Sequence, residues 1–170
     1  MNRVAEFKKV SKEEFLKDFT DTFPDYSDEH VMQIYDEIKL PKRATKKSAG
    51  YDIYAPIDFE LSPGETIKIP TGIRVLMHDD YVFMIYPRSG FGFKYRLQLN
   101  NTVGVIDADY SDSDNEGHIF IKITNDSNEG KKFSCEKGIA FAQGIFMQYG
   151  ITFDDDVTDE RNGGFGSTTK

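Results

Sequence analysis

Two segments of this chain combine residue types that could bind and cleave a phosphate ester. In the first, Arg88, Ser89 and Gly90 offer a guanidinium, a hydroxyl and backbone N–H groups, which are donors that a phosphate anion accepts. The segment lacks the Gly-Lys-Ser/Thr ending of a Walker loop. It therefore indicates either a phosphate contact or an ordinary turn after a strand.

The second segment, residues 101–110, is an apolar stretch that ends in two carboxylates and an aromatic ring. Asp107 or Asp109 could act as a base toward water, while Tyr110 offers a flat surface for stacking. Acidic residues continue at positions 112, 114 and 116, so a strand that ends in a solvated acidic loop is the plain alternative. A calcium loop is disfavoured because the remaining ligand positions and the distal glutamate are absent.

Zinc sites and the usual nucleophiles find no support in the residue pattern. The three histidines are scattered along the chain, and the single cysteine, Cys135, has no disulfide partner. Ser89 does not lie in a Gly-x-Ser-x-Gly elbow. We expect Cys135 to be a reduced thiol in a cytoplasm.

The composition fits one compact domain with a short extension. The chain has 170 residues, a formal net charge of −8 and a pI near 4.9, which argues against broad electrostatic binding to nucleic acid. No apolar run approaches the roughly 20 residues of a membrane-spanning helix, and no secretory segment opens the chain. We therefore expect a cytoplasmic protein with no nucleic-acid partner and no membrane partner.

Residues 1–39 are expected to form a helical N-terminal extension. Ser11 begins a capping box that precedes the apolar residues Phe15 and Phe19 at helical spacing. Ser27 begins a second helix, in which Val31 and Ile34 share one face. Because two short helices bury little surface alone, we expect them to pack on the segment that follows.

Residues 40–160 are expected to form a β-rich domain, because the periodicity changes at Leu40. Short apolar segments separated by turn clusters lie at 66–69, 73–77, 82–86, 97–99, 118–123 and 139–146. This pattern favours an antiparallel sandwich or barrel. Residues 161–170 are rich in Gly, Ser and Thr, and they indicate either a frayed terminus or, because of Phe165, a flexible C-terminal lid.

Five segments, taken in order, resemble the five motifs of the trimeric dUTP nucleotidohydrolase (dUTPase) family, of the bacterial or bacteriophage type. The segments are Ala49-Gly50-Tyr51-Asp52-Ile53-Tyr54-Ala55, Pro87-Arg88-Ser89-Gly90, Gly104 to Tyr110, Gly138 to Gln143, and Gly163 to Thr168. They span residues 49–168, and their common order is more specific than any one of them.

The resemblance implies an all-β fold, a distorted jelly-roll β-barrel, and a homotrimer whose active sites are shared between subunits. It implies hydrolysis of dUTP to dUMP and pyrophosphate, which would limit uracil in DNA and supply dUMP for dTMP synthesis. Magnesium (Mg2+) would be held by the substrate phosphates rather than by protein ligands. The setting would be the cytoplasm of a bacterium, or of the host for a phage protein.

The resemblance also implies a role for residues that contact the phosphates. Asp107 would activate the water that attacks the α-phosphorus, and Gln143 would be the second catalytic residue, in contact with the phosphates. Arg88, Ser89 and Gly90 are also expected to contact the phosphates, and Asp52 is expected to support the site structurally.

Base and sugar recognition would fall to the third motif. It is expected to form a β-hairpin that pairs with uracil through the backbone of Gly104, Val105 and Ile106, with Asn101 near the base. Tyr110 would stack under the deoxyribose and leave no room for a 2′-hydroxyl.

The tail would close over the bound nucleotide and expel water. Phe165 would cover the uracil. The expected contacts that complete the anion cradle are Arg161, Gly166, Ser167 and Thr168.

Three features depart from the family pattern. The segment Gly138 to Gln143 lacks the usual Asp-Arg pair, and Arg161 lies one residue closer to Phe165 than usual. The acidic segment Ser111 to Gly117 replaces a common Arg-Gly, and we expect it to be an exposed loop that does not affect the chemistry.

Two alternative functions remain open from the sequence. A dCTP deaminase would share the jelly roll and the nucleotide cradle, although it lacks the Asp-Tyr pair and the Gly-Gly-Phe-Gly-Ser-Thr lid. A trimeric interaction or regulatory protein could use the same fold to bind a partner through the acidic segment or the N-terminal helices.

Overall fold

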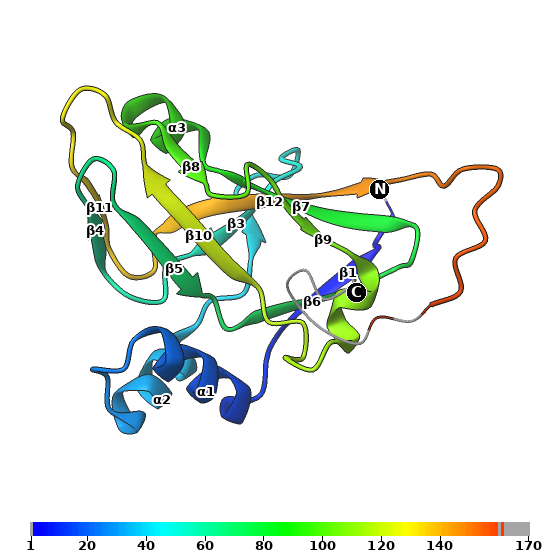
Figure 1. Cartoon of the computed structure of the whole chain (residues 1–170), viewed down its shortest axis with the longest axis horizontal. Coiled ribbons are helices and arrows are strands. Elements are labelled where there is room, and N and C mark those ends of the chain that lie inside the picture. Colours follow the sequence, from blue (N-terminus) through cyan, green and yellow to red (C-terminus); the bar gives the residue numbers. More distant parts are fainter. Residues whose placement is uncertain (1, 160, 162–170) are drawn as a thin grey trace.

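β-Strands dominate the computed structural model of the chain, which describes residues 2–159 and 161 (Figure 1). The strands are β1 Ala5–Lys9, β2 Lys42–Arg43, β3 Tyr51–Tyr54, β4 Phe59–Leu61, β5 Thr66–Pro70, β6 Ile73–Met77, β7 Tyr81–Pro87, β8 Leu97–Leu99, β9 Gly104–Ile106, β10 Phe120–Asn125, β11 Phe133–Cys135 and β12 Ala140–Gln148. The helices are α1 Lys12–Thr22, α2 Asp28–Glu37, α3 Ser89–Tyr95 and the 3-10 helix η1 Ala108–Asp112. The all-β expectation for the main domain is confirmed.

The strands form four antiparallel sheets rather than one closed barrel in the described part of the chain. The largest sheet has the order β2-β3-β12-β7-β9, and a three-stranded sheet has the order β5-β10-β8. Two further pairs, β1-β6 and β11-β4, complete the set. This open arrangement agrees with a distorted jelly roll, because neighbouring strands in a sheet are mostly distant in sequence.

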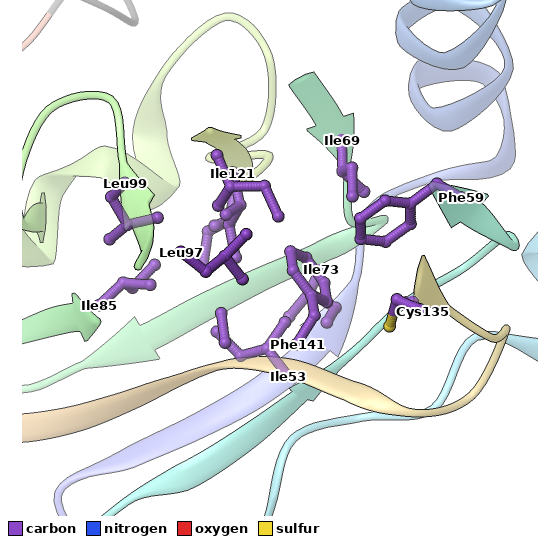
Figure 2. Packing of buried hydrophobic residues seen from close by; sticks show 14 of the residues in the cluster. Ile53, Phe59, Ile69, Ile73, Ile85, Leu97, Leu99, Ile121, Cys135 and Phe141 are labelled. Carbon is purple, nitrogen blue, oxygen red and sulfur yellow. The ribbon is translucent and has the colours of Figure 1, made fainter. Parts of the chain in front are cut away.

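The main core lies between these sheets. Strand β10 shows the alternation that produces it, since Ile121 and Ile123 are buried while Lys122 is exposed. In Figure 2, Ile121 and Phe141 converge from different sheets on this common interior. Each fully buried side chain of this size stabilises the fold by about 1.5–3 kcal/mol.

The two predicted N-terminal helices are confirmed. Ser11 Oγ accepts a hydrogen bond from Glu14 N at 3.1 Å, and Ser27 Oγ accepts one from His30 N at 3.3 Å, so both predicted N-caps are formed. The helices bury a second apolar cluster, which also contains Ile57 of the main domain. They therefore pack on the β domain, as their small size required.

The first 39 residues are nevertheless not wholly helical. Strand β1 pairs with β6 along its whole length, from Ala5 opposite Met77 to Lys9 opposite Ile73. Sequence periodicity did not reveal this strand because Phe7 is its only large apolar residue. The Phe7 ring packs on Phe83 with a centroid distance of 5.3 Å, so β1 joins the main core.

The segment after β7 is a short helix rather than a turn. Arg88 is the N-cap of α3, and the helix ends at Arg96, which has a φ of +52°. Phe91 and Tyr95 lie one turn apart and both pack on Phe133, at centroid distances of 4.9 and 5.2 Å. These ring contacts hold a helix that contains two glycines. None of the helices in the described residues has the length and apolar character of a membrane span.

Candidate active site

A cavity of about 590 Å³ lies beside β9 and η1, and its size suits a small-molecule ligand. It gathers most of the third-motif residues that the sequence singled out. The predicted residues in its lining are Asn101, Gly104, Val105, Ile106, Asp107 and Tyr110. Arg161 of the predicted tail also lines it.

Strand β9 presents a backbone edge at this cavity. It is the last strand of the five-stranded sheet, and among the described residues only β7 pairs with it. A Cβ atom on Gly104 would lie 3.1 Å from Cβ of Ile85, so glycine allows β9 to lie close to β7. The other edge of β9 offers N–H donors and C=O acceptors in alternation.

The predicted β-hairpin at the third motif is wrong in its pairing. Strand β8 pairs with β10 and strand β9 pairs with β7, so the two strands belong to different sheets. The chain turns between them at Thr102, which has a φ of +66° and donates its N–H to Leu99 O at 3.0 Å. The turn redirects the chain from one sheet to the other, and it places Asn101 at the cavity.

Arg161 contacts both carboxylates that follow β9. Its Nη2 lies 2.6 Å from Oδ2 of Asp107, and its Nε lies 2.8 Å from Oδ1 of Asp109. The Asp107 and Asp109 side chains are about half exposed, at 52% and 53%, whereas Arg161 is only 15% exposed. The shortened spacing to the predicted lid therefore still allows Arg161 to reach the cavity, and its contact with phosphates stays a prediction.

Tyr110 forms a fixed wall of the cavity. The residue is 6% exposed, and its hydroxyl donates to His118 O at 2.8 Å and accepts from Asn115 Nδ2 at 3.0 Å. Burial raises the pKa of Tyr110, and the hydrogen bond from Asn115 offsets this rise in part. The phenol is thus neutral at physiological pH, and the Arg161 guanidinium lies 5.8 Å from its ring centroid.

A second group of predicted residues gathers at the end of β7. Arg88 Nε lies 3.5 Å from Oδ1 of Asp52, and Gln143 is the β12 residue opposite Asp52 of β3. Gln143 Nε2 also donates to Pro87 O at 3.4 Å. Ser89 and Gly90 follow as the first residues of α3. Asp52 therefore lies where it can orient the Arg88 guanidinium.

The two groups lie at opposite ends of β7. Ile106 lies opposite Phe83, so the same register puts Asp107 level with Val82, six residues from Arg88 along the strand. At about 3.3 Å per residue this separation is roughly 20 Å. One chain therefore does not bring all of the predicted site residues together. Phe165, Gly166, Ser167 and Thr168 lie outside the described residues.

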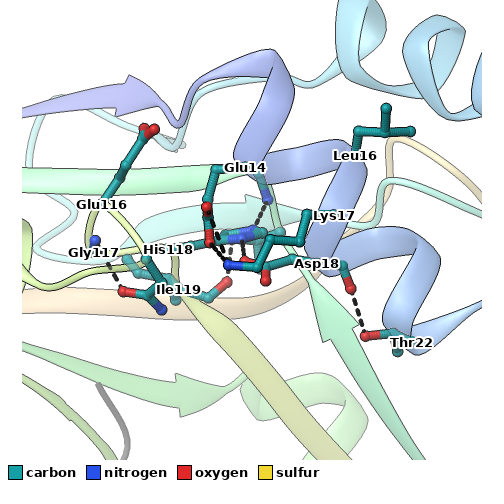
Figure 3. Close-up of polar contacts among 12 residues, drawn as sticks. Glu14, Leu16, Lys17, Asp18, Thr22, Glu116, Gly117, His118 and Ile119 are labelled. Carbon is teal, nitrogen blue, oxygen red and sulfur yellow. Dashed lines mark hydrogen bonds and ion pairs between the residues drawn. The ribbon is translucent and has the colours of Figure 1, made fainter. Parts of the chain in front are cut away.

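The acidic segment is not the exposed loop that its composition predicts. Ser113 and Gly117 are buried, and Glu116 Oε2 accepts a hydrogen bond from Ser11 N at 2.7 Å, at the start of α1. Arg74 Nη1 lies 3.9 Å from the same oxygen. Figure 3 shows Glu116 and His118 beside α1. The segment is folded against the N-terminal helices because its acidic side chain caps one of them.

Five residues of the three-stranded sheet line the cavity but were not predicted as site residues, namely Lys68, Leu99, Phe120, Ile121 and Lys122. Lys68 and Lys122 lie opposite each other on β5 and β10, in positions that alternation marks only as exposed. Asn115, which donates a hydrogen bond to the Tyr110 hydroxyl, was also not predicted, because the acidic segment that contains it was expected to be solvated. Among the described residues, no group of three or more His, Cys, Asp or Glu side chains could hold a metal ion.

Comparison with known proteins identifies the family. Residues 36–169 match the family model described as dUTPase. The deoxyuridine 5'-triphosphate nucleotidohydrolase of Lactococcus lactis is 44% identical over 134 residues, which cover 77% of this chain and 88% of that protein. The protein of the same name from Dictyoglomus turgidum is 37% identical over 147 residues, which cover 81% and 95%.

Solved structures agree with the sequence matches. The dUTPase of Streptococcus mutans has a TM-score of 0.63 at 33% identity, covering 86% of this chain and 97% of that one. The dUTPase of phage phi11 of S. aureus, which coordinates a structural Mg(II) ion, has a TM-score of 0.62 at 20% identity, covering 92% and 98%. The phage protein supports the fold, and the bacterial relatives together with the family model show that this chain belongs to the dUTPase family.

Proposed function

We propose that this protein hydrolyses dUTP to dUMP and pyrophosphate, with the nucleoside in the cavity beside β9. The observation that carries the proposal is that an open strand edge, a carboxylate and a fixed aromatic ring meet in this one cavity. The carboxylate belongs to Asp107 and the ring to Tyr110. In a cell this reaction would limit uracil in DNA and supply dUMP for dTMP synthesis.

Uracil recognition is assigned to the backbone of Gly104, Val105 and Ile106, with Asn101 nearby. Uracil offers two carbonyl acceptors on either side of one N–H donor, which suits the alternation of groups along a strand edge. Cytosine offers an amino donor where uracil has an acceptor, so it would leave a backbone group unpaired. The Tyr110 ring would lie under the deoxyribose and clash with a 2′-hydroxyl.

Asp107 is assigned the proton transfer. Its carboxylate would accept a proton from the water whose oxygen attacks the α-phosphorus. The bond from the α-phosphorus to the bridging oxygen breaks, and that oxygen leaves with pyrophosphate. Arg161 is near enough to exchange its contact with Asp107 for phosphate oxygens when substrate is bound.

The phosphate contacts support a homotrimer with shared sites. Arg88 and Asp107 lie roughly 20 Å apart in one chain, but both must reach the same triphosphate. A second chain that supplies Arg88, Ser89, Gly90 and Gln143 would remove this mismatch. Exposed apolar side chains after β12 also favour association, namely Ile151 at 74%, Phe153 at 114% and Val157 at 76% exposure.

Magnesium fits this site as a group carried by the substrate. The Asp107 carboxylate lines the cavity and is half exposed, so it would lie near a hydrated cation on the triphosphate once Arg161 had turned to the phosphates. When bound, Mg2+ would neutralise charge on the phosphate oxygens that hold it. The proposed setting is a bacterial cytoplasm, or the host cytoplasm for a phage protein.

Product analysis with a panel of nucleotides tests this function. Pyrophosphate release is measured with dUTP, UTP, dCTP and dTTP, with ammonia measured in parallel. We expect pyrophosphate from dUTP and little from the other three. Ammonia from dCTP would identify a deaminase instead, and the absence of both products would favour a protein that only binds a partner.

A further inference from the structure

Tyr110 is anchored from behind by residues that do not face the cavity. Its hydroxyl donates to the carbonyl oxygen of His118 at 2.8 Å and accepts from Nδ2 of Asn115 at 3.0 Å. Both the donor and an acceptor function of the hydroxyl are thus in use. The ring cannot tilt away from the cavity without breaking one of these bonds.

Helix α1 fixes His118 in turn. The His118 side chain is fully buried, and Gly72 N donates to its Nε2 at 2.8 Å. Because a backbone N–H must donate, Nε2 is unprotonated, and the proton on Nδ1 is donated to Oδ2 of Asp18 at 2.6 Å. Asp18 belongs to α1 and lies 100 positions away in sequence. Figure 3 shows the α1 side chain reaching toward His118.

The acidic segment fixes Asn115 in the same way. Gly117 N donates to Oδ1 of Asn115 at 3.1 Å, which orients the amide so that its nitrogen points to Tyr110. Gly117 has a φ of +73°, and a Cβ atom there would lie 2.7 Å from Tyr110 O, so only glycine fits. Glu116, between these two residues, accepts from Ser11 N at 2.7 Å.

We propose that Asn115, His118 and Asp18 are positioning residues for Tyr110, through which helix α1 sharpens the discrimination between deoxyribo- and ribonucleotides. None of the three is among the described residues that line the cavity, so they act through the ring. A steric filter excludes a 2′-hydroxyl only if its wall cannot yield. The proposal rests on the dUTP hydrolysis proposed above.

A double-mutant cycle between Asn115 and Tyr110 tests the inference. The measured quantity is the ratio of kcat/KM for dUTP to kcat/KM for UTP in the parent, in Asn115→Ala, in Tyr110→Phe and in the double variant. We expect Asn115→Ala to lower this ratio about three- to tenfold, as for one lost hydrogen bond, and Tyr110→Phe to lower it at least as much, because it removes both hydrogen bonds of the hydroxyl. The double variant should have about the same ratio as Tyr110→Phe, because Asn115 acts only through the hydroxyl. Asn128→Ala, in an exposed loop, is the matched control.

Variants of Asp18 test the contribution of α1. Asp18→Ala should lower the same ratio. Asp18→Asn should retain it, because the amide oxygen can still accept the hydrogen bond from Nδ1–H of His118. Asp21→Ala, at an exposed position of the same helix, is the control and should match the parent. A merely structural role would lower the melting temperature without changing the ratio.

Each outcome has a distinct meaning. A parent-like ratio in Asn115→Ala, or an equal further loss when it is added to Tyr110→Phe, would overturn the positioning role. If Asn115→Ala does not fold, Asn115→Asp keeps the size and removes the donor, and the same expectations apply. A parent that releases no pyrophosphate from dUTP would instead overturn the proposed function.

Discussion

Two carboxylates follow β9, and only one of them is assigned the chemistry. Asp107 and Asp109 both contact Arg161 and are about equally exposed, so neither burial nor pairing distinguishes them. Asp107 directly follows the strand whose edge would bind the base and lines the cavity, whereas Asp109 lies in the first turn of η1 and is not among the lining residues. The nearer residue is therefore the candidate for contact with the attacking water.

Asp107→Asn should retain dUTP binding and lose most turnover. The amide has almost the same shape but cannot take a proton from water, so kcat should fall by about 10²–10⁴-fold. Single-turnover hydrolysis and binding of a non-hydrolysable dUTP analogue separate the two effects. Asp109→Asn is the matched control, and a larger loss there would transfer the role to Asp109.

Tyr110→Ala should weaken discrimination against UTP more than it slows dUTP hydrolysis. Removal of the ring opens space for a 2′-hydroxyl, so the dUTP-to-UTP ratio of kcat/KM should fall by about tenfold or more. Tyr149→Ala, which removes a half-exposed ring beyond the cavity, should leave the ratio unchanged. An unchanged ratio in Tyr110→Ala would make Tyr110 a packing residue only.

At the scale of elements, local signals predicted α1, α2 and six of the strands, but not β1 or α3. The caps at Ser11 and Ser27 and the apolar alternation of β10 are each decided within a few residues, so they are visible in the sequence. The prediction that the acidic segment is an exposed loop was wrong because the contacts of this segment are not local. Glu116 reaches Ser11 across 105 positions, and composition alone describes such a carboxylate as solvated.

The Glu116 contact should make stability depend on pH. Burial alone would raise the pKa of Glu116, but hydrogen bonds from Ser11 and the charge of Arg74 lower it below its ordinary value of 4.5. A lowered carboxylate pKa adds stability above the ordinary value, and this stability is lost as pH falls through the folded-state pKa. The contribution at a partly exposed site is about 1 kcal/mol or less.

Glu116→Gln tests this dependence. At pH 7 the variant should have a lower free energy of unfolding than the parent, and the difference should shrink as pH falls below 4.5. Urea unfolding at several pH values measures it, with Glu13→Gln, an exposed acid on α1, as the control. A difference that is constant with pH would mean that the carboxylate charge is not involved.

Truncation after Glu160 should leave a folded protein that binds dUTP poorly. The last strand of the described residues, β12, ends at Gln148, so we expect the core to be retained, whereas the site would lose Arg161 and the predicted lid. Melting temperature and titration with a non-hydrolysable dUTP analogue measure the two properties. Full activity after truncation would show that residues 161–170 are only the terminus that their composition first suggested.

At the scale of the whole molecule, the strand register limits what one chain can do. Sequence motifs predicted both residue groups of the proposed site but could not reveal their separation, because that depends on which strands pair. Strand β7 places Asp107 and Arg88 at its two ends, roughly 20 Å apart. We therefore propose that a complete site includes residues from a second copy of the chain, and the exposed apolar residues after β12 support this proposal.

Subunit mixing tests most directly whether one active site takes residues from two chains. Asp107→Asn and Arg88→Ala chains are each expected to be nearly inactive, and both should elute as the parent oligomer. When they are unfolded together in equal amounts and refolded, about a quarter of the parent activity should return, since each site draws one intact Asp107 and one intact Arg88 independently. Activity no higher than the mean of the two variants would show that each site lies within one chain.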